Sequence, residues 1–111
     1  MKILILGAGR VGSSLASTLS RQEYEVSIVD LNKDKLLRLQ EDYDLSTEIG
    51  HASHPRTLEK AGADQDTILL AVTNSDECNI ASCQIAKSKF NVKKTICRLS
   101  DSSYLESLEA F

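Results

Sequence analysis

The sequence lacks the features that identify membrane-spanning, secreted and zinc-binding proteins. None of its segments reaches the roughly 18 consecutive apolar residues that a membrane helix needs, and its first residues lead into a short apolar run without the pattern of a signal peptide. The three cysteines form no CxxC pair and match no zinc-binding spacing. We therefore expect a cytoplasmic chain that does not insert into a membrane, keeps its cysteines reduced and holds no metal.

Net charge and histidine are also low. The formal net charge is −3, and the cluster of Lys33, Lys35 and Arg38 alternates with acidic residues, as on the solvated face of a helix. This balance gives no general attraction for nucleic acid, so we expect no nucleic-acid partner. His51 and His54 are the only histidines, and no paired nucleophile lies near them in the sequence, so we predict no catalytic residues.

Glycine, in contrast, gathers near the N-terminus. The run Ile3–Leu6 is apolar throughout, as in a strand that is buried on both faces of a parallel sheet. Gly7, Gly9 and Gly12 follow at once, and a helical apolar pattern opens at Val11. In dinucleotide-binding proteins the first such glycine permits a tight turn, the second lets the backbone approach a pyrophosphate, and the third lets the helix pack close to the strand.

An acidic residue stands at the distance that this motif requires. Asp30 ends the expected strand that begins at Glu25, and its carboxylate can accept hydrogen bonds from ribose hydroxyls. Strand, glycines, helix and acid together indicate binding of a dinucleotide or adenine nucleotide, whereas the glycines alone would be weak evidence. The alternative is that the glycines serve packing alone and that Asp30 is a solvated strand end.

Strands and helices alternate along the rest of the chain. We expect further strands at 25–30, 47–49, 66–73 and 94–98, and helices at 33–43, from Pro55 to Gly62, at 76–89 and after Ser100. This alternation with short loops predicts one α/β domain over residues 1–111, with a three-layered, Rossmann-like, doubly wound parallel sheet. Because a full domain of this kind adds another strand, we expect the chain to be truncated before the sixth strand.

The expected strand ends supply further candidate residues. Thr73 and Arg98 stand, like Asp30, at carboxyl ends of expected parallel strands, where open α/β sheets bind ligands. One alternative stays open at each of these two positions. For Arg98, the alternative is an ion pair with Asp76 or Glu77 instead of a contact with a ligand. For Thr73, the alternative is that the residue merely ends its strand.

Several longer stretches point to a known family. They are ILGAGRVG at 5–12, IVD at 28–30, GHASHP at 50–55, AGAD at 61–64, LLAVTNSDE at 69–77 with Asn79, and CRL at 97–99. Through these stretches the whole chain resembles the RCK (also called KTN) family, and within it the N-terminal lobes of the TrkA-type regulatory subunits of bacterial Trk potassium uptake systems. The glycine motif is shared by many families, whereas GHASHP and LLAVTNSDE are far more specific.

The resemblance implies a domain that binds NAD or NADH, and in some relatives ATP, ADP or AMP, without turning the nucleotide over. It also implies homo-oligomers, from dimers to gating rings, that contact a membrane potassium channel or transporter subunit at the inner face of the bacterial cell membrane. The nucleotide would change the geometry of the ring and so bias the pore.

The resemblance also assigns ligand contacts to individual residues. The phosphates would be held by Gly7, Ala8, Gly9, Arg10, Val11 and Gly12. Asp30 would contact the adenosine ribose, and His51 and Ala52 would flank the adenine, although relatives often carry an acid where this chain has His51. The alternative for His51 is a loop position that faces solvent. Thr73 and Asn74 would follow the second half of a dinucleotide, and Arg98 would reach a phosphate or the neighbouring subunit.

Two other functions stay open from the sequence alone. The first is that the chain is the cofactor-binding half of an NAD-dependent oxidoreductase. The second is that it is a regulatory domain of a potassium efflux antiporter. The oxidoreductase would need catalytic residues beyond the cofactor-binding half, and this chain has no room for them.

Overall fold

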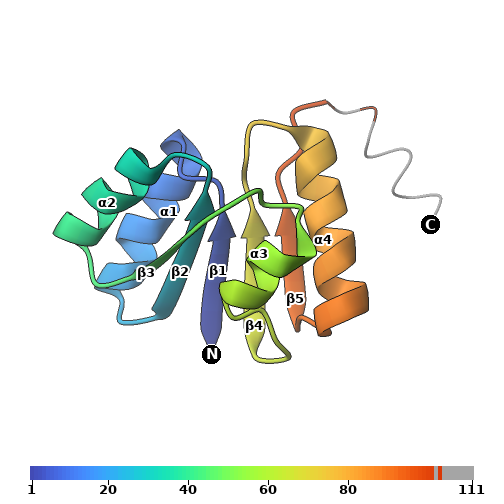
Figure 1. Ribbon diagram of the computed structural model, residues 1–111, viewed down its shortest axis with the longest axis horizontal. Coiled ribbons are helices and arrows are strands. Elements are labelled where there is room, and N and C mark those ends of the chain that lie inside the picture. The colour runs from blue at the N-terminus through green and yellow to red at the C-terminus, as the bar shows by residue number, and fades with distance from the viewer. Residues whose placement is uncertain (102, 104–111) are drawn as a thin grey trace.

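The computed structural model describes residues 1–101 and 103, and over these residues five strands form one parallel sheet (Figure 1). In chain order the elements are β1 (Lys2–Leu6), α1 (Arg10–Arg21), β2 (Glu25–Asp30), α2 (Lys33–Asp42), β3 (Ser46–Ile49), α3 (Pro55–Lys60), β4 (Thr67–Ala71), α4 (Asp76–Phe90) and β5 (Lys94–Cys97). The strand order β3-β2-β1-β4-β5 is that of a Rossmann fold. The predicted doubly wound parallel sheet is therefore confirmed.

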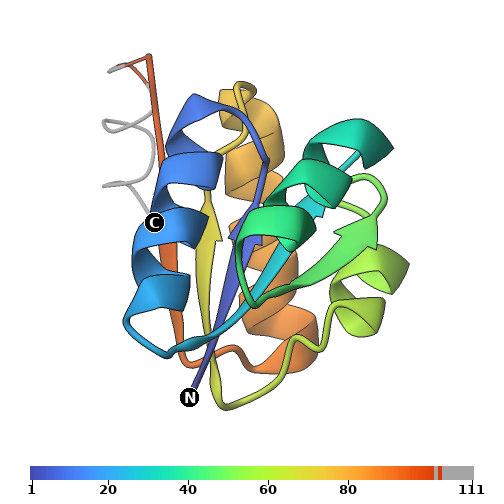
Figure 2. The same ribbon diagram turned by 90° about the vertical axis from the view of Figure 1, so that its left-hand side faces the viewer.

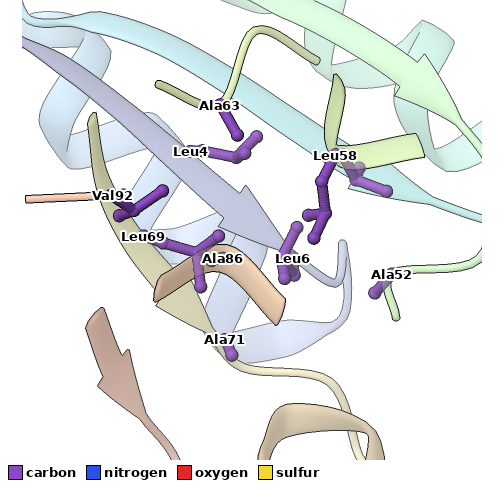
Figure 3. Close-up of a cluster of buried hydrophobic side chains, with 10 residues drawn as sticks. Leu4, Leu6, Ala52, Leu58, Ala63, Leu69, Ala71, Ala86 and Val92 are labelled. Carbon is purple, nitrogen blue, oxygen red and sulfur yellow. The ribbon is translucent and has the colours of Figure 1, made fainter. Parts of the chain in front are cut away.

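Helices cover both faces of the sheet and produce the three layers (Figures 1 and 2). On one face, Ala16 of α1 and Leu36 of α2 pack with Ile3 and Ile5 of β1. On the other face, side chains of α3 and α4 pack with the alternate residues of β1 and with β4. The labelled members of this second cluster, drawn in Figure 3, are Leu4, Leu6, Ala52, Leu58, Ala63, Leu69, Ala71, Ala86 and Val92. Because β1 is buried on both faces from Ile3 to Leu6, these four residues are apolar without alternation.

The predicted elements agree with the observed ones to within a few residues. The largest difference is at β4, which ends at Ala71 rather than at residue 73, because the Thr73 amide donates to the side chain of Asn79 in α4 and the Thr73 hydroxyl to the Ser75 carbonyl. Pro55 opens α3 as predicted, and Gly62 follows that helix with a positive φ of 90°. The expected final helix, with Tyr104, Leu105 and Leu108, lies outside the described residues.

The parallel arrangement brings all the strand ends to one edge of the sheet, the upper edge in Figure 1. β1 lies between β2 and β4, and the residue pairs Leu6–Val29 and Leu6–Ala71 end the two ladders side by side. From β1 the chain continues to β2 on one side of the sheet, whereas from β4 it continues to β5 on the other side. The direction in which strands are added therefore reverses between β1 and β4. Open α/β sheets bind ligands at such a reversal point.

Candidate functional site

A cavity of about 660 Å³ opens at this reversal point, above the carboxyl ends of β1, β2 and β4. Its volume lies within the range of small-molecule sites, roughly 300–1,000 Å³. The wall consists of Gly7, Gly9, Arg10, Val11, Val29, Asp30, Leu31, Lys35, Gly50, His51, Ala52, Val72, Thr73, Asn74, Ser75, Cys78 and Arg98. All of the residues predicted to contact a ligand line this cavity, except Ala8 and Gly12.

The three glycines of the motif have three different surroundings. Gly7 has a positive φ of 106°, and a β-carbon there would lie 3.0 Å from backbone atoms of Thr73. Gly12 packs against the turn so closely that a β-carbon would lie 1.7 Å from the Gly7 carbonyl oxygen. A β-carbon on Gly9, in contrast, would meet no protein atom within 4 Å. The fold therefore requires Gly7 and Gly12, whereas Gly9 leaves open space on the cavity wall.

The N-terminus of α1 differs from the other helix starts. Side chains of Asn32, His54 and Ser75 cap α2, α3 and α4 by accepting hydrogen bonds from backbone amides of the first turn. The cap position of α1 is Gly9, which offers no side-chain bond, and the first turn of α1 holds no acidic residue. The first amides of α1 and the positive end of its dipole are therefore available to an anion in the cavity.

The carboxylate of Asp30 organises the opposite side of the glycine turn. One oxygen accepts a hydrogen bond from the Ala8 amide at 2.8 Å, and the other accepts one from the Asn32 amide, also at 2.8 Å. Ala8 is buried and contributes to the site through this bond rather than through its side chain. Because an ionised carboxylate has about four acceptor positions, Asp30 keeps capacity for ribose hydroxyls on its cavity side.

A buried side chain holds the third part of the wall, where β4 and β5 end. Asn79 of α4 has no solvent exposure. Its Oδ1 accepts hydrogen bonds from the Thr73 amide at 2.9 Å and the Thr73 hydroxyl at 2.6 Å. Its Nδ2 donates to the Thr73 carbonyl at 3.1 Å and the Arg98 carbonyl at 3.0 Å. Thr73 therefore does more than end a strand, because Asn79 fixes it beside Arg98.

The charged side chains of the wall favour an anionic ligand. Arg10, Lys35 and Arg98 contribute three positive charges, against the single carboxylate of Asp30. Among the described residues, none forms an ion pair with any of these three cations. Of the two pairings left open for Arg98, the one with Asp76 is not formed: the carboxylate of Asp76 makes no ion pair with Arg98 and accepts hydrogen bonds from the amides of residues 100 and 101.

Two further parts of the wall suit the nucleobase of a nucleotide. Leu31, which directly follows Asp30, exposes 67% of its surface beside the cavity. The ring of His51 is exposed, and its Nδ1 lies 3.0 Å from the Ser53 hydroxyl, whereas Ala52 is buried. Sequence reasoning did not find Leu31 or Cys78 on this wall. For Leu31 a signal existed, since it directly follows the carboxyl end of an expected strand, where open α/β sheets bind ligands.

The described residues hold neither a membrane-spanning helix nor a metal centre. No helix among them combines the length and apolar character needed to cross a bilayer. No three side chains of histidine, cysteine, aspartate or glutamate gather there as metal ligands. The free cysteines Cys83 and Cys97 interact with each other, and burial raises the pKa of the Cys83 thiol to about 12.

Comparison with known proteins places this geometry in a family. The model of the TrkA-N domain matches residues 3–111. The Trk system potassium uptake protein TrkA of Vibrio alginolyticus is 48% identical over 110 residues, which are 99% of this chain and 24% of that protein. The chain therefore spans about a quarter of the length of this relative.

Solved structures share the fold. The Kef CTD of Shewanella denitrificans in its AMP-bound form superposes with a TM-score of 0.77 at 25% identity, over 96% of this chain and 66% of that one. The GsuK channel bound to NAD superposes with a TM-score of 0.71 at 20% identity, over 96% of this chain and 20% of that one. With the family match over nearly its whole length, the chain belongs to the TrkA-N domain family.

Proposed function

We propose that this domain senses a nucleotide, NAD or NADH in the first place, and thereby regulates a potassium uptake channel or transporter. ATP, ADP and AMP share the adenosine and phosphate groups that the cavity suits, so they are the next candidates. The proposal assigns the phosphates to residues 7–12, the adenosine ribose to Asp30 and the adenine to the region of Ala52. The rest of a dinucleotide would lie along Thr73, Asn74 and Arg98.

The observation that carries the proposal is the open start of α1. Gly9 is a glycine for which the fold gives no reason, since a β-carbon there would touch nothing. It lies at the one helix start among α1 to α4 without a side-chain cap, and that start faces the cavity. Close approach of a phosphate to the Gly9 backbone explains both features together.

The surrounding charges support the same ligand class. The guanidinium groups of Arg10 and Arg98 suit phosphate oxygens, to which arginine binds in a bidentate manner. Asp30 suits a free 2′-hydroxyl and disfavours a 2′-phosphate, because two negative groups in contact repel each other. Of the two solved structures above, one is bound to NAD and the other to AMP, and both ligands contain an adenosine ribose.

Regulation rather than catalysis is proposed because the related proteins carry the name of a potassium uptake protein. Both oxygens of Asp30 accept hydrogen bonds from backbone amides, which suits a carboxylate that shapes the turn and binds a ribose. We infer that the partner is a membrane potassium channel or transporter subunit, that the domain forms homo-oligomers, and that it is peripheral to the cytoplasmic face of the membrane.

Calorimetric titration tests the proposal. The chain is titrated with NAD, NADH, NADPH, ATP, ADP and AMP, and the same panel is repeated with Gly9→Asp. We expect at least one of the nucleotides that lack a 2′-phosphate, NAD, NADH, ATP, ADP and AMP, to bind the wild-type chain and none to bind the variant, because the added carboxylate occupies the phosphate position. Wild-type protein that binds none of the six nucleotides would refute nucleotide sensing.

A second assay separates regulation from the oxidoreductase alternative. The chain is incubated with NADH and a panel of carbonyl compounds, and absorbance at the NADH maximum is followed. We expect no consumption above background. Sustained consumption that disappears in Gly9→Asp would support the enzyme instead.

A further inference from the structure

The chain that leaves β5 is tied to the start of α4. We call residues 98–101 the exit segment. Asp76, the first residue of α4, accepts hydrogen bonds from the Ser100 amide at 2.9 Å and the Asp101 amide at 2.8 Å, one to each carboxylate oxygen. Three residues further along the same helix, Asn79 donates to the Arg98 carbonyl at 3.0 Å. Residues three apart lie on one helix face, so both side chains hold the exit segment from the same side.

These bonds are of the kinds that fix a position firmly. Asn79 is fully buried, and its amide group uses two acceptor and two donor positions, so its hydrogen-bonding capacity is satisfied. The bonds to Asp76 join a carboxylate to backbone amides and are charge-assisted. Neither residue lines the cavity, although Thr73 and Arg98, which are both bonded to Asn79, do.

The consequence falls on the guanidinium of Arg98. Its backbone is fixed by Asn79 and by a hydrogen bond from its amide to the Ala71 carbonyl at 3.0 Å. Its side chain is exposed on the cavity wall and makes no ion pair with a described residue. Asp76 accepts its hydrogen bonds from amides two and three residues beyond Arg98, and it forms no ion pair with the guanidinium.

We propose that Asp76 and Asn79 are positioning residues that direct Arg98 at the part of the ligand beyond the adenosine monophosphate, and that they link this contact to the exit segment. The proposal rests on the nucleotide binding proposed above. In the arrangement proposed above, AMP would end at the phosphate beside the glycine loop, on the β1 and β2 side of the cavity. NAD would extend further, toward the ends of β4 and β5, where Arg98 lies. The positioning residues therefore matter for NAD and not for AMP.

The test compares the affinities for NAD and AMP in wild type and Asp76→Ala. Asp76 is half-buried near the surface, so its replacement is safer for folding than replacement of buried Asn79. We expect the variant to bind NAD about tenfold more weakly and AMP with less than a twofold change. Asp76→Asn, which keeps one acceptor oxygen, should fall between the two. Asp34→Ala is the matched control, because it also removes a carboxylate from the first turn of a helix but away from the cavity wall.

A double-mutant cycle asks whether Asp76 acts through Arg98. In the Arg98→Ala background, Asp76→Ala should weaken NAD binding no further, since the group that it positions is gone. Hydrogen exchange supplies a readout of the exit segment itself. We expect NAD, but not AMP, to slow exchange of the amides of Ser100 and Asp101 in wild type, and neither ligand to slow it in Asp76→Ala.

Each outcome decides the proposal. An unchanged ratio of NAD to AMP affinity in Asp76→Ala overturns it. This includes an equal loss of affinity for both ligands, which would indicate a general structural role. A further loss of NAD affinity in the Arg98→Ala background also overturns it. Wild-type protein that binds neither NAD nor AMP refutes the positioning role, and nucleotide sensing is refuted with it only when NADH, NADPH, ATP and ADP also fail to bind. Binding of both with an unchanged ratio refutes the positioning role alone.

Discussion

Alanine substitutions at Gly12 and Gly9 should separate the structural glycines of the motif from the ligand-binding one. In Gly12→Ala the new β-carbon would lie 1.7 Å from the Gly7 carbonyl oxygen and 2.8 Å from its carbonyl carbon, whereas ordinary contacts begin near 3.4 Å. Both opposing atoms belong to the backbone, so no flexible side chain can yield. The helix start must move away from the turn.

The size of the effect follows from this geometry. Overpacking against backbone costs about 3 kcal/mol, the upper end of the usual range. Alanine recovers about 1 kcal/mol through its better helix propensity. The balance is a loss of about 2 kcal/mol, which corresponds to a melting temperature lower by roughly 10 °C in a domain of this size.

Gly9→Ala should behave in the opposite way. Gly9 has φ −76° and ψ −161°, which alanine adopts without strain, and a β-carbon there would have no neighbour within 4 Å. The poorer N-cap preference of alanine and the lower entropy of its unfolded chain nearly cancel, so stability should change by less than about 1 kcal/mol. The methyl group should nevertheless hinder approach of the pyrophosphate and weaken NAD binding at least about tenfold, or 1.4 kcal/mol.

Thermal unfolding followed by circular dichroism measures the first effect, and calorimetric titration with NAD measures the second. The reasoning fails if Gly12→Ala melts like wild type, since the close helix contact would then not constrain the fold. It also fails if Gly9→Ala is destabilised as much as Gly12→Ala. Gly9→Ala that binds NAD with wild-type affinity would show that no phosphate approaches this backbone.

Three further predictions concern selectivity, reactivity and acid stability. NAD should bind about tenfold tighter than NADP because Asp30 repels a 2′-phosphate. Lys35→Ala should widen this difference in affinity, measured by calorimetry, because it removes a positive charge from the cavity wall. Equal affinities for NAD and NADP in wild type would contradict the role of Asp30. Burial raises the pKa of the Cys83 thiol from 9.0 to about 12, so its thiolate fraction at neutral pH falls about a thousandfold. Iodoacetamide should therefore label Cys83 rapidly only after unfolding, and fast labelling of Cys83 in the native protein would contradict this. The hydrogen bond from Lys2 lowers the pKa of Asp64 below 3.8, so the stability that it contributes is present above pH 3.8 and is lost as the pH falls through the lower folded value. Asp64→Asn should therefore lower the stability at pH 5 to 7, where the ionised carboxylate contributes, and change it little well below about pH 4, so that the stability of the variant depends less on pH than that of wild type. A variant as stable as wild type at about pH 5 to 7 would contradict the assignment.

The sequence by itself determined the features whose causes lie within a few consecutive residues. The turn after β1 depends on Gly7, whose positive φ a glycine supplies most easily, and the close helix start depends on Gly12 five residues later. Pro55 and Gly62 likewise mark the two ends of α3 through local backbone preferences. Alternating strands and helices with short loops left a doubly wound parallel sheet as the fold.

Only the tertiary structure decided which side chains meet across the strand ends. Asn79 joins Thr73 to Arg98, and Asp76 holds the exit segment instead of pairing with that arginine. These contacts link residues as far as 25 positions apart. They exist because β4 and β5 are neighbours and α4 starts beside both of their ends. Apolar periodicity and local turn signals report which face of an element is buried, but they carry no information on which polar groups of distant elements come within hydrogen-bonding distance.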